Sequence, residues 1–73
     1  MLKYIMVEDV ITNDDIGQYT SYGIEVRYGE QVIDRISDID TDREGVETLC
    51  ALCNKLRLSP IHLRDVVEDY LEK

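Results

Sequence analysis

The chain has 73 residues, of which 44% are hydrophobic and one is proline, and its formal net charge is −8. This length allows one domain, and the hydrophobic share excludes a disordered tail. Nucleic acids and anionic membranes require a cationic surface, so we expect neither as a partner. The acidity is uneven, because residues 1–40 carry nine acids against three bases. A basic protein partner therefore stays open.

The first half of the chain has the pattern of strands. Residues 2–12 are mostly β-branched or apolar and predict a first strand, and Asn13-Asp14-Asp15 with Gly17 predicts a turn after it. The clearest alternation follows within the expected strand Tyr19–Tyr28, where Tyr22, Ile24, Val26 and Tyr28 occupy every second position. This period of two predicts a second strand with one buried and one wet face. The side chains expected on the wet face are Ser21, Glu25 and Arg27.

A glycine followed by any residue suits a two-residue type II′ turn, so Gly29-Glu30 predicts an antiparallel hairpin. Its second arm is expected over Gln31–Ile39. The apolar residues of this arm do not alternate strictly, which predicts a bulge or an early end near Ser37.

The second half reads as two amphipathic helices. Thr41 and Glu44 have the spacing of a capping box and predict a helix that runs to about Arg57. Ser59 as N-cap and Pro60 at the first helical position predict the start of the second helix. The apolar stripes expected to face the core are Val46, Leu49, Cys50, Leu52, Cys53 and Leu56 on the first helix, and Leu63, Val66, Val67, Tyr70 and Leu71 on the second.

The expected fold class is α+β: a three-stranded antiparallel sheet followed by two amphipathic helices packed on one face (β-β-β-α-α). We expect one domain over residues 1–73, with the sheet in 1–40 and the helical pair in 41–73. Three strands with such a cover are near the minimum for independent stability.

The two cysteines form a Cys-x-x-Cys pair in mid-helix. A redox pair of this type places its first thiol at a helix N-terminus, and a zinc site needs four ligands, whereas Cys50 and Cys53 lie inside an apolar stripe. We therefore interpret both as small core hydrophobes, and as reduced thiols in a cytoplasmic protein. A metal site formed by Cys50, Cys53 and His62 is the alternative.

No catalytic constellation or cofactor motif is evident, so we expect a protein that is not an enzyme and binds no cofactor. His62 and Arg64 have no capping or packing role that the sequence explains. With the acids that follow them they form the candidate interaction surface: His62, Arg64, Asp65, Glu68 and Asp69. The same acids disfavour a helix-turn-helix that binds DNA, because duplex phosphates would repel them.

The run Ser59-Pro60-Ile61-His62-Leu63-Arg64-Asp65-Val66-Val67-Glu68-Asp69, with Asp38–Arg43 upstream, resembles a family of short, functionally uncharacterised proteins of anaerobic Gram-positive bacteria. The resemblance covers about residues 20–73 and implies no activity, cofactor or catalytic residue.

The leading hypothesis is a small, acidic, non-enzymatic protein-interaction module that self-associates. Small size and strands whose edges can pair between chains favour it. One alternative is an acidic regulator of a basic or nucleic-acid-binding partner protein, and another is the metal-binding protein described above. A cytoplasmic location is expected, because Met1–Val7 is followed by acids and no cleavage site or membrane-spanning run is present.

Overall fold

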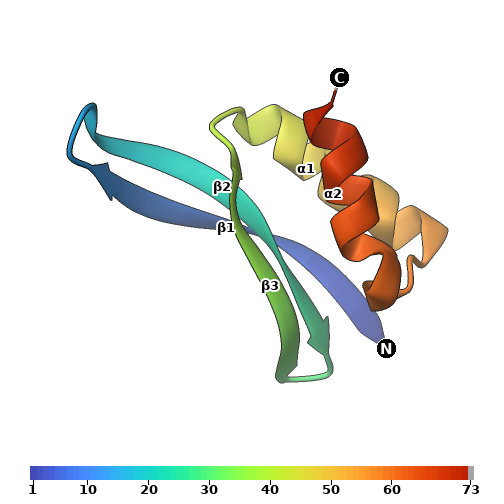
Figure 1. Cartoon of the computed structure of the whole chain (residues 1–73). Coiled ribbons are helices and arrows are strands. Elements are labelled where there is room, and N and C mark those ends of the chain that lie inside the picture. The colour runs from blue at the N-terminus through green and yellow to red at the C-terminus, as the bar shows by residue number, and fades with distance from the viewer. Residues whose placement is uncertain (73) are drawn as a thin grey trace.

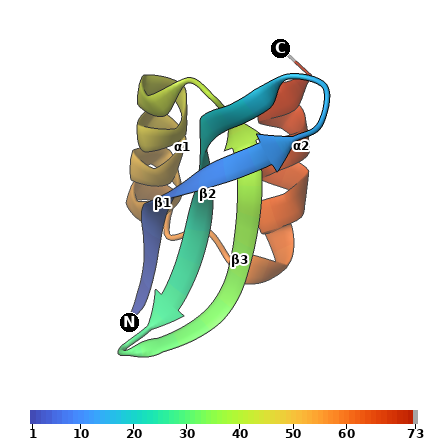
Figure 2. The same ribbon diagram turned by 90° about the vertical axis from the view of Figure 1, so that its left-hand side faces the viewer.

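A computed structural model describes residues 1–72. Its elements are, in chain order, β1 (Leu2–Asn13), β2 (Gly17–Tyr28), β3 (Gln31–Asp40), α1 (Arg43–Leu56), the 3₁₀ turn η1 (Pro60–His62) and α2 (Leu63–Leu71). The strands form one antiparallel sheet in the order β1-β2-β3. Both helices lie on one side of this sheet (Figures 1 and 2). The predicted α+β class and the β-β-β-α-α order are confirmed.

Both predicted turns are present. In the first, the side chain of Asn13 accepts hydrogen bonds from the backbone N–H groups of Asp15 (2.8 Å) and Ile16 (3.3 Å), which explains why an asparagine ends β1. In the second, Gly29 has φ +62°, whereas Glu30 is not among the residues with positive φ. Positive φ at the first central residue alone fits the predicted type II′ turn.

A bulge interrupts β3 where the sequence loses its alternation. Tyr22 pairs with Asp40 and Ile24 pairs with Ile36, so three residues of β3 lie opposite the single residue Gly23 of β2. A Cβ atom on Gly23 would lie 2.2 Å from the carbonyl oxygen of Ile36, so only glycine allows the strands to approach this closely. The bulge predicted near Ser37 is confirmed, and β3 continues beyond it.

The predicted capping box is wrong. Helix α1 begins at Arg43 with Asp42 as N-cap, and no side chain caps it. The reason is that β3 extends to Asp40, whose Oδ1 accepts the N–H of Asp42 at 3.1 Å and shapes the link. Ser59 does occupy the predicted N-cap position before Pro60, but its side chain makes no capping hydrogen bond, and the first turn is 3₁₀.

The core lies between the sheet and the helices, and its buried hydrophobic residues are Tyr4, Ile24, Val26, Ile39, Val46, Leu49, Cys50, Cys53, Leu63 and Val67. The predicted stripes were too wide, because Leu52, Leu56 and Leu71 are exposed. Leu52 instead lines an open groove of about 500 Å³ that also contacts Leu49 and Tyr70. No helix within residues 1–72 is long and apolar enough to cross a membrane.

Candidate interaction edge

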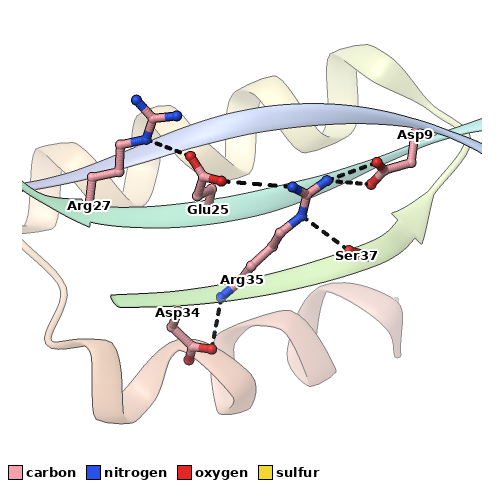
Figure 3. A network of polar contacts seen from close by, with 6 residues as sticks. All are labelled: Asp9, Glu25, Arg27, Asp34, Arg35 and Ser37. Atoms are coloured by element: carbon pink, nitrogen blue, oxygen red, sulfur yellow. Dashed lines mark hydrogen bonds and ion pairs between the residues drawn. The ribbon is translucent and has the colours of Figure 1, made fainter. Parts of the chain in front are cut away.

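The sheet face opposite the helices is covered by its own charged side chains (Figure 3). Glu25, predicted to face water, is only 6% exposed. Its carboxylate accepts from Nε of Arg27 at 2.5 Å and lies 3.8 Å from Nη1 of Arg35. Arg35 also donates to both carboxylate oxygens of Asp9 (2.8 and 2.9 Å) and to Ser37 Oγ (3.3 Å). Side chains from all three strands therefore bury a carboxylate where no helix packs.

Two features obstruct the β3 edge. Besides the bulge near Ser37, a second irregularity at Ile33 breaks the regular ladder, and bulges of this kind hinder pairing with a further strand. In addition, Arg64 of α2 donates to both carboxylate oxygens of Asp34 at 2.7 and 3.2 Å. The hydrogen bonds from Arg64 lower the pKa of Asp34 below its ordinary value.

The N-terminal part of the β1 edge is closed by one side chain. Asn54 of α1 accepts the backbone N–H of Tyr4 through Oδ1 and donates through Nδ2 to the backbone oxygen of the same residue, both at 2.8 Å. The Asn54 amide thus takes the place of a neighbouring strand. The Tyr4 hydroxyl also donates to the carbonyl of Leu58, which holds β1 against the end of α1.

The rest of the β1 edge has no such cover. Since the backbone groups of Tyr4 point away from β2, the regular alternation of an antiparallel strand directs those of Met6, Glu8, Val10 and Thr12 to the same side. The β1–β2 register runs without interruption from Leu2–Tyr28 to Asn13–Gly17, so the alternation persists along the strand. Within residues 1–72, no side chain or loop hydrogen-bonds to these four backbone positions. We call this segment, Met6–Thr12, the open edge.

The part of the open edge nearer the β1–β2 turn lies where the hairpin extends beyond the helices (Figure 1), whereas Met6 at its other end packs against the core. Val10 is 65% exposed, and Ile16 at the hairpin turn is 70% exposed. Edge strands are usually protected by charged side chains, above all lysine, by a proline or by a bulge. Met6–Thr12 contains no lysine, proline or bulge. Its charged residues are the acids Glu8 and Asp9.

The residues of the candidate surface predicted from sequence lie on η1 and α2. His62 is exposed at the end of η1, and Asp65, Glu68 and Asp69 are exposed on α2. The sequence did not explain Arg64. In the structure its role is an ion pair with Asp34. As an interaction surface this set stays a prediction.

The cysteines are buried in the core, as interpreted from the sequence. Cys50 is 6% exposed and Cys53 is 1% exposed. Burial raises the pKa of the Cys50 thiol to about 11, so the nucleophilic thiolate is scarce at neutral pH. Within residues 1–72, no group of three or more His, Cys, Asp or Glu side chains could hold a metal ion, so His62 is not brought together with the two thiols.

Sequence reasoning did not find the open edge or Asn54. The order of three hairpin-connected strands already places β1 at an edge, which was a usable signal. The contact between Asn54 and Tyr4 spans 50 residues and has no local signature. Asn54 directly follows Cys53 on α1. The helical pattern explains why the apolar residues beside Asn54 are buried, but it does not predict a partner for the Asn54 amide.

These features define a small α+β protein with an open three-stranded sheet, one helical layer and one strand edge left free. The chain belongs to DUF6514, a family of unknown function, whose family model matches residues 1–73. The resemblance to an uncharacterised family is therefore confirmed, and the match includes the N-terminal twenty residues, which the expected span left out. Its restriction to anaerobic Gram-positive bacteria stays a prediction. The searches of curated proteins and of solved structures found no match.

Proposed function

We propose that the protein is a non-enzymatic interaction module that accepts a strand at the open edge, and that it self-associates in this way. The observation that carries the proposal is the contrast between the edges. Asn54 closes β1 at Tyr4, while the backbone groups of Met6, Glu8, Val10 and Thr12 have no hydrogen-bond partner within residues 1–72. Strand addition uses such groups for affinity and alternate side chains for specificity.

Amide hydrogen exchange measured at increasing protein concentration tests the proposal. The N–H groups of Met6, Glu8, Val10 and Thr12 should exchange quickly in dilute protein and become protected as it associates. The odd-numbered amides of β1, which bond β2, should be protected at every concentration. A protein that stays monomeric at millimolar concentration in 1 M salt, with the four edge amides exchanging quickly, would refute self-association at this edge.

The substitution Val10→Pro sharpens this test. Proline has no backbone N–H, so the substitution removes one donor of the open edge. Because the N–H of Val10 faces solvent rather than β2, the fold should survive its loss. Association should then be lost while the circular dichroism spectrum is kept. Val10→Thr is the matched control, because it keeps both the N–H and a β-branched side chain. If Val10→Pro associates as strongly as Val10→Thr, the contact lies elsewhere.

A basic protein strand is the second candidate occupant of this edge. Residues 4–26, which contain the whole β1–β2 turn, carry five acids and no base. Two of these acids, Asp9 and Glu25, are paired with arginines, which leaves Glu8, Asp14 and Asp15 to attract a cationic partner. A peptide of alternating lysine and valine is a suitable probe. Its binding should protect the same edge amides and weaken with added salt.

A further inference from the structure

We infer that two copies pair their β1 strands antiparallel about a two-fold axis at Val10, which joins two sheets into one of six strands. This inference rests on the proposed function and adds its partner and register. Because the backbone groups of even-numbered residues point to the open edge, only registers that pair even residues with even residues form hydrogen bonds. Each such register places the two-fold axis at one residue of β1.

Acidic side chains and the clamp at Tyr4 eliminate most of these registers. An axis at Glu8 or at Asp9 would place that acid opposite its own copy, and like charges directly opposite destabilise a strand pair. At Asp9 the ion pair with Arg35, which is 41% exposed, weakens this repulsion without removing it. An axis at Val7 or nearer the N-terminus would require the backbone groups of Tyr4, which already bond to Asn54. The axis must therefore lie beyond Asp9.

Of the registers that remain, the one centred on Val10 makes the most hydrogen bonds. Each even-numbered residue paired in this way exchanges two backbone hydrogen bonds with its partner. An axis at Val10 pairs Glu8 with Thr12, Val10 with Val10, and Thr12 with Glu8. An axis at Ile11 pairs only Val10 with Thr12 in both directions, because Glu8 would meet Asp14 of the turn.

The Val10 register also suits the side chains. The two exposed Val10 side chains meet at the axis on the helix side of the joined sheet, and Asp9 lies beside Ile11 of the other copy. No acid directly faces an acid in the paired segment. A two-fold axis perpendicular to the sheet keeps the helices of both copies on the same face.

Charge opposes this dimer and gives it a distinctive dependence on salt. Each copy carries a formal charge of −8, so the copies repel, and salt shortens the range of that repulsion from about 10 Å at 0.1 M to about 3 Å at 1 M. Sedimentation should therefore show an association constant that rises at least about threefold between 0.1 and 1 M sodium chloride. Binding to a basic strand has the opposite salt dependence.

Disulfide trapping tests the register. In this register the two Val10 Cα atoms lie about 5.5 Å apart, within the range of a disulfide, whereas the two Thr12 Cα atoms lie about 14 Å apart. Val10→Cys should form a covalent dimer in oxidised glutathione, and Thr12→Cys, the matched control, should not. The native thiols are buried and present in both variants.

The outcomes separate the register from the proposed function. A dimer in which Thr12→Cys crosslinks as readily as Val10→Cys overturns the register and leaves strand addition standing. If the self-association constant falls as salt is added, the conclusion that a second copy occupies the open edge is overturned. A protein that is monomeric in 1 M salt, with unprotected edge amides and no lysine–valine peptide bound, overturns the register and the proposed function together.

Discussion

The clamp between Asn54 and the backbone of Tyr4 can be removed by the single substitution Asn54→Ala. Two hydrogen bonds of 2.8 Å are lost, each worth about 1 kcal/mol net. The freed groups belong to Tyr4, which is only 3% exposed, but Asn54 itself is exposed, so truncating its side chain opens them to water and the larger penalty of a dry, unpaired group does not apply. Alanine recovers about 0.5 kcal/mol of helix propensity. The expected loss in free energy of unfolding is therefore about 1.5 kcal/mol.

Urea denaturation followed by far-ultraviolet circular dichroism measures this loss. In a domain of this size, about 1.5 kcal/mol corresponds to a melting temperature lower by about 6–12 °C. Lys55→Ala is the matched control, since Lys55 is exposed on the same helix and its removal should change stability by less than about 0.5 kcal/mol. Asn54→Asp should be intermediate, because it keeps the acceptor for the Tyr4 N–H and loses the donor.

The same substitution should lengthen the open edge. Without the Asn54 amide, the backbone groups of Tyr4 become available to a second strand, and registers nearer the N-terminus become possible. Edge protection at Tyr4 that appears only on association would show this. If Asn54→Ala is as stable as Lys55→Ala, the amide does not hold the edge, and the explanation of why β1 is closed at that point is wrong.

Three further substitutions probe the sheet and its links. Gly23→Ala should destabilise by about 3 kcal/mol or unfold the chain, since the new Cβ meets the Ile36 carbonyl at 2.2 Å; denaturation measures it, and near-native stability would contradict the close approach. Tyr70→Phe removes a 2.6 Å hydrogen bond to Asp40 and should cost about 1 kcal/mol. That bond raises the pKa of Tyr70 from 10.0 to about 12, so its contribution is complete below pH 10 and lost toward pH 12. Titration at 295 nm should show this late ionisation disappear in the variant. Glu25→Gln should cost about 2 kcal/mol by thermal melting, less than a fully buried pair because both arginines are partly exposed; an unchanged melting temperature would refute the role of the network.

Local patterns were sufficient for the elements of the fold and for their order. The alternation up to Tyr28, the Gly29-Glu30 turn and the irregular apolar spacing of β3 each reflect a property of a few adjacent residues. The capping box failed for a reason of the same scale. Thr41 has the correct spacing to Glu44, but β3 reaches Asp40 and shifts the helix start to Arg43.

Long-range contacts were beyond such patterns. Glu25 alternates like a wet-face residue, and its burial depends on Arg35, which arrives from another strand. The partner of Arg64 is Asp34, 30 residues away. The candidate site depends most on contacts of this kind, because an edge is open only where no distant side chain closes it.

A three-stranded sheet with one helical layer has three openings, namely the outer face and two edges. This chain closes most of them with single side chains: Arg35 covers the outer face, Arg64 and the bulges close β3, and Asn54 closes β1 as far as Tyr4. One lysine could have protected Met6–Thr12 in the same way, but the only charged residues of this segment are the acids Glu8 and Asp9. These acids exclude some registers of a β1–β1 pair but do not prevent the two strands from pairing, and the repulsion between them weakens with added salt. On the proposed function, ionic strength therefore governs how much of the protein is paired.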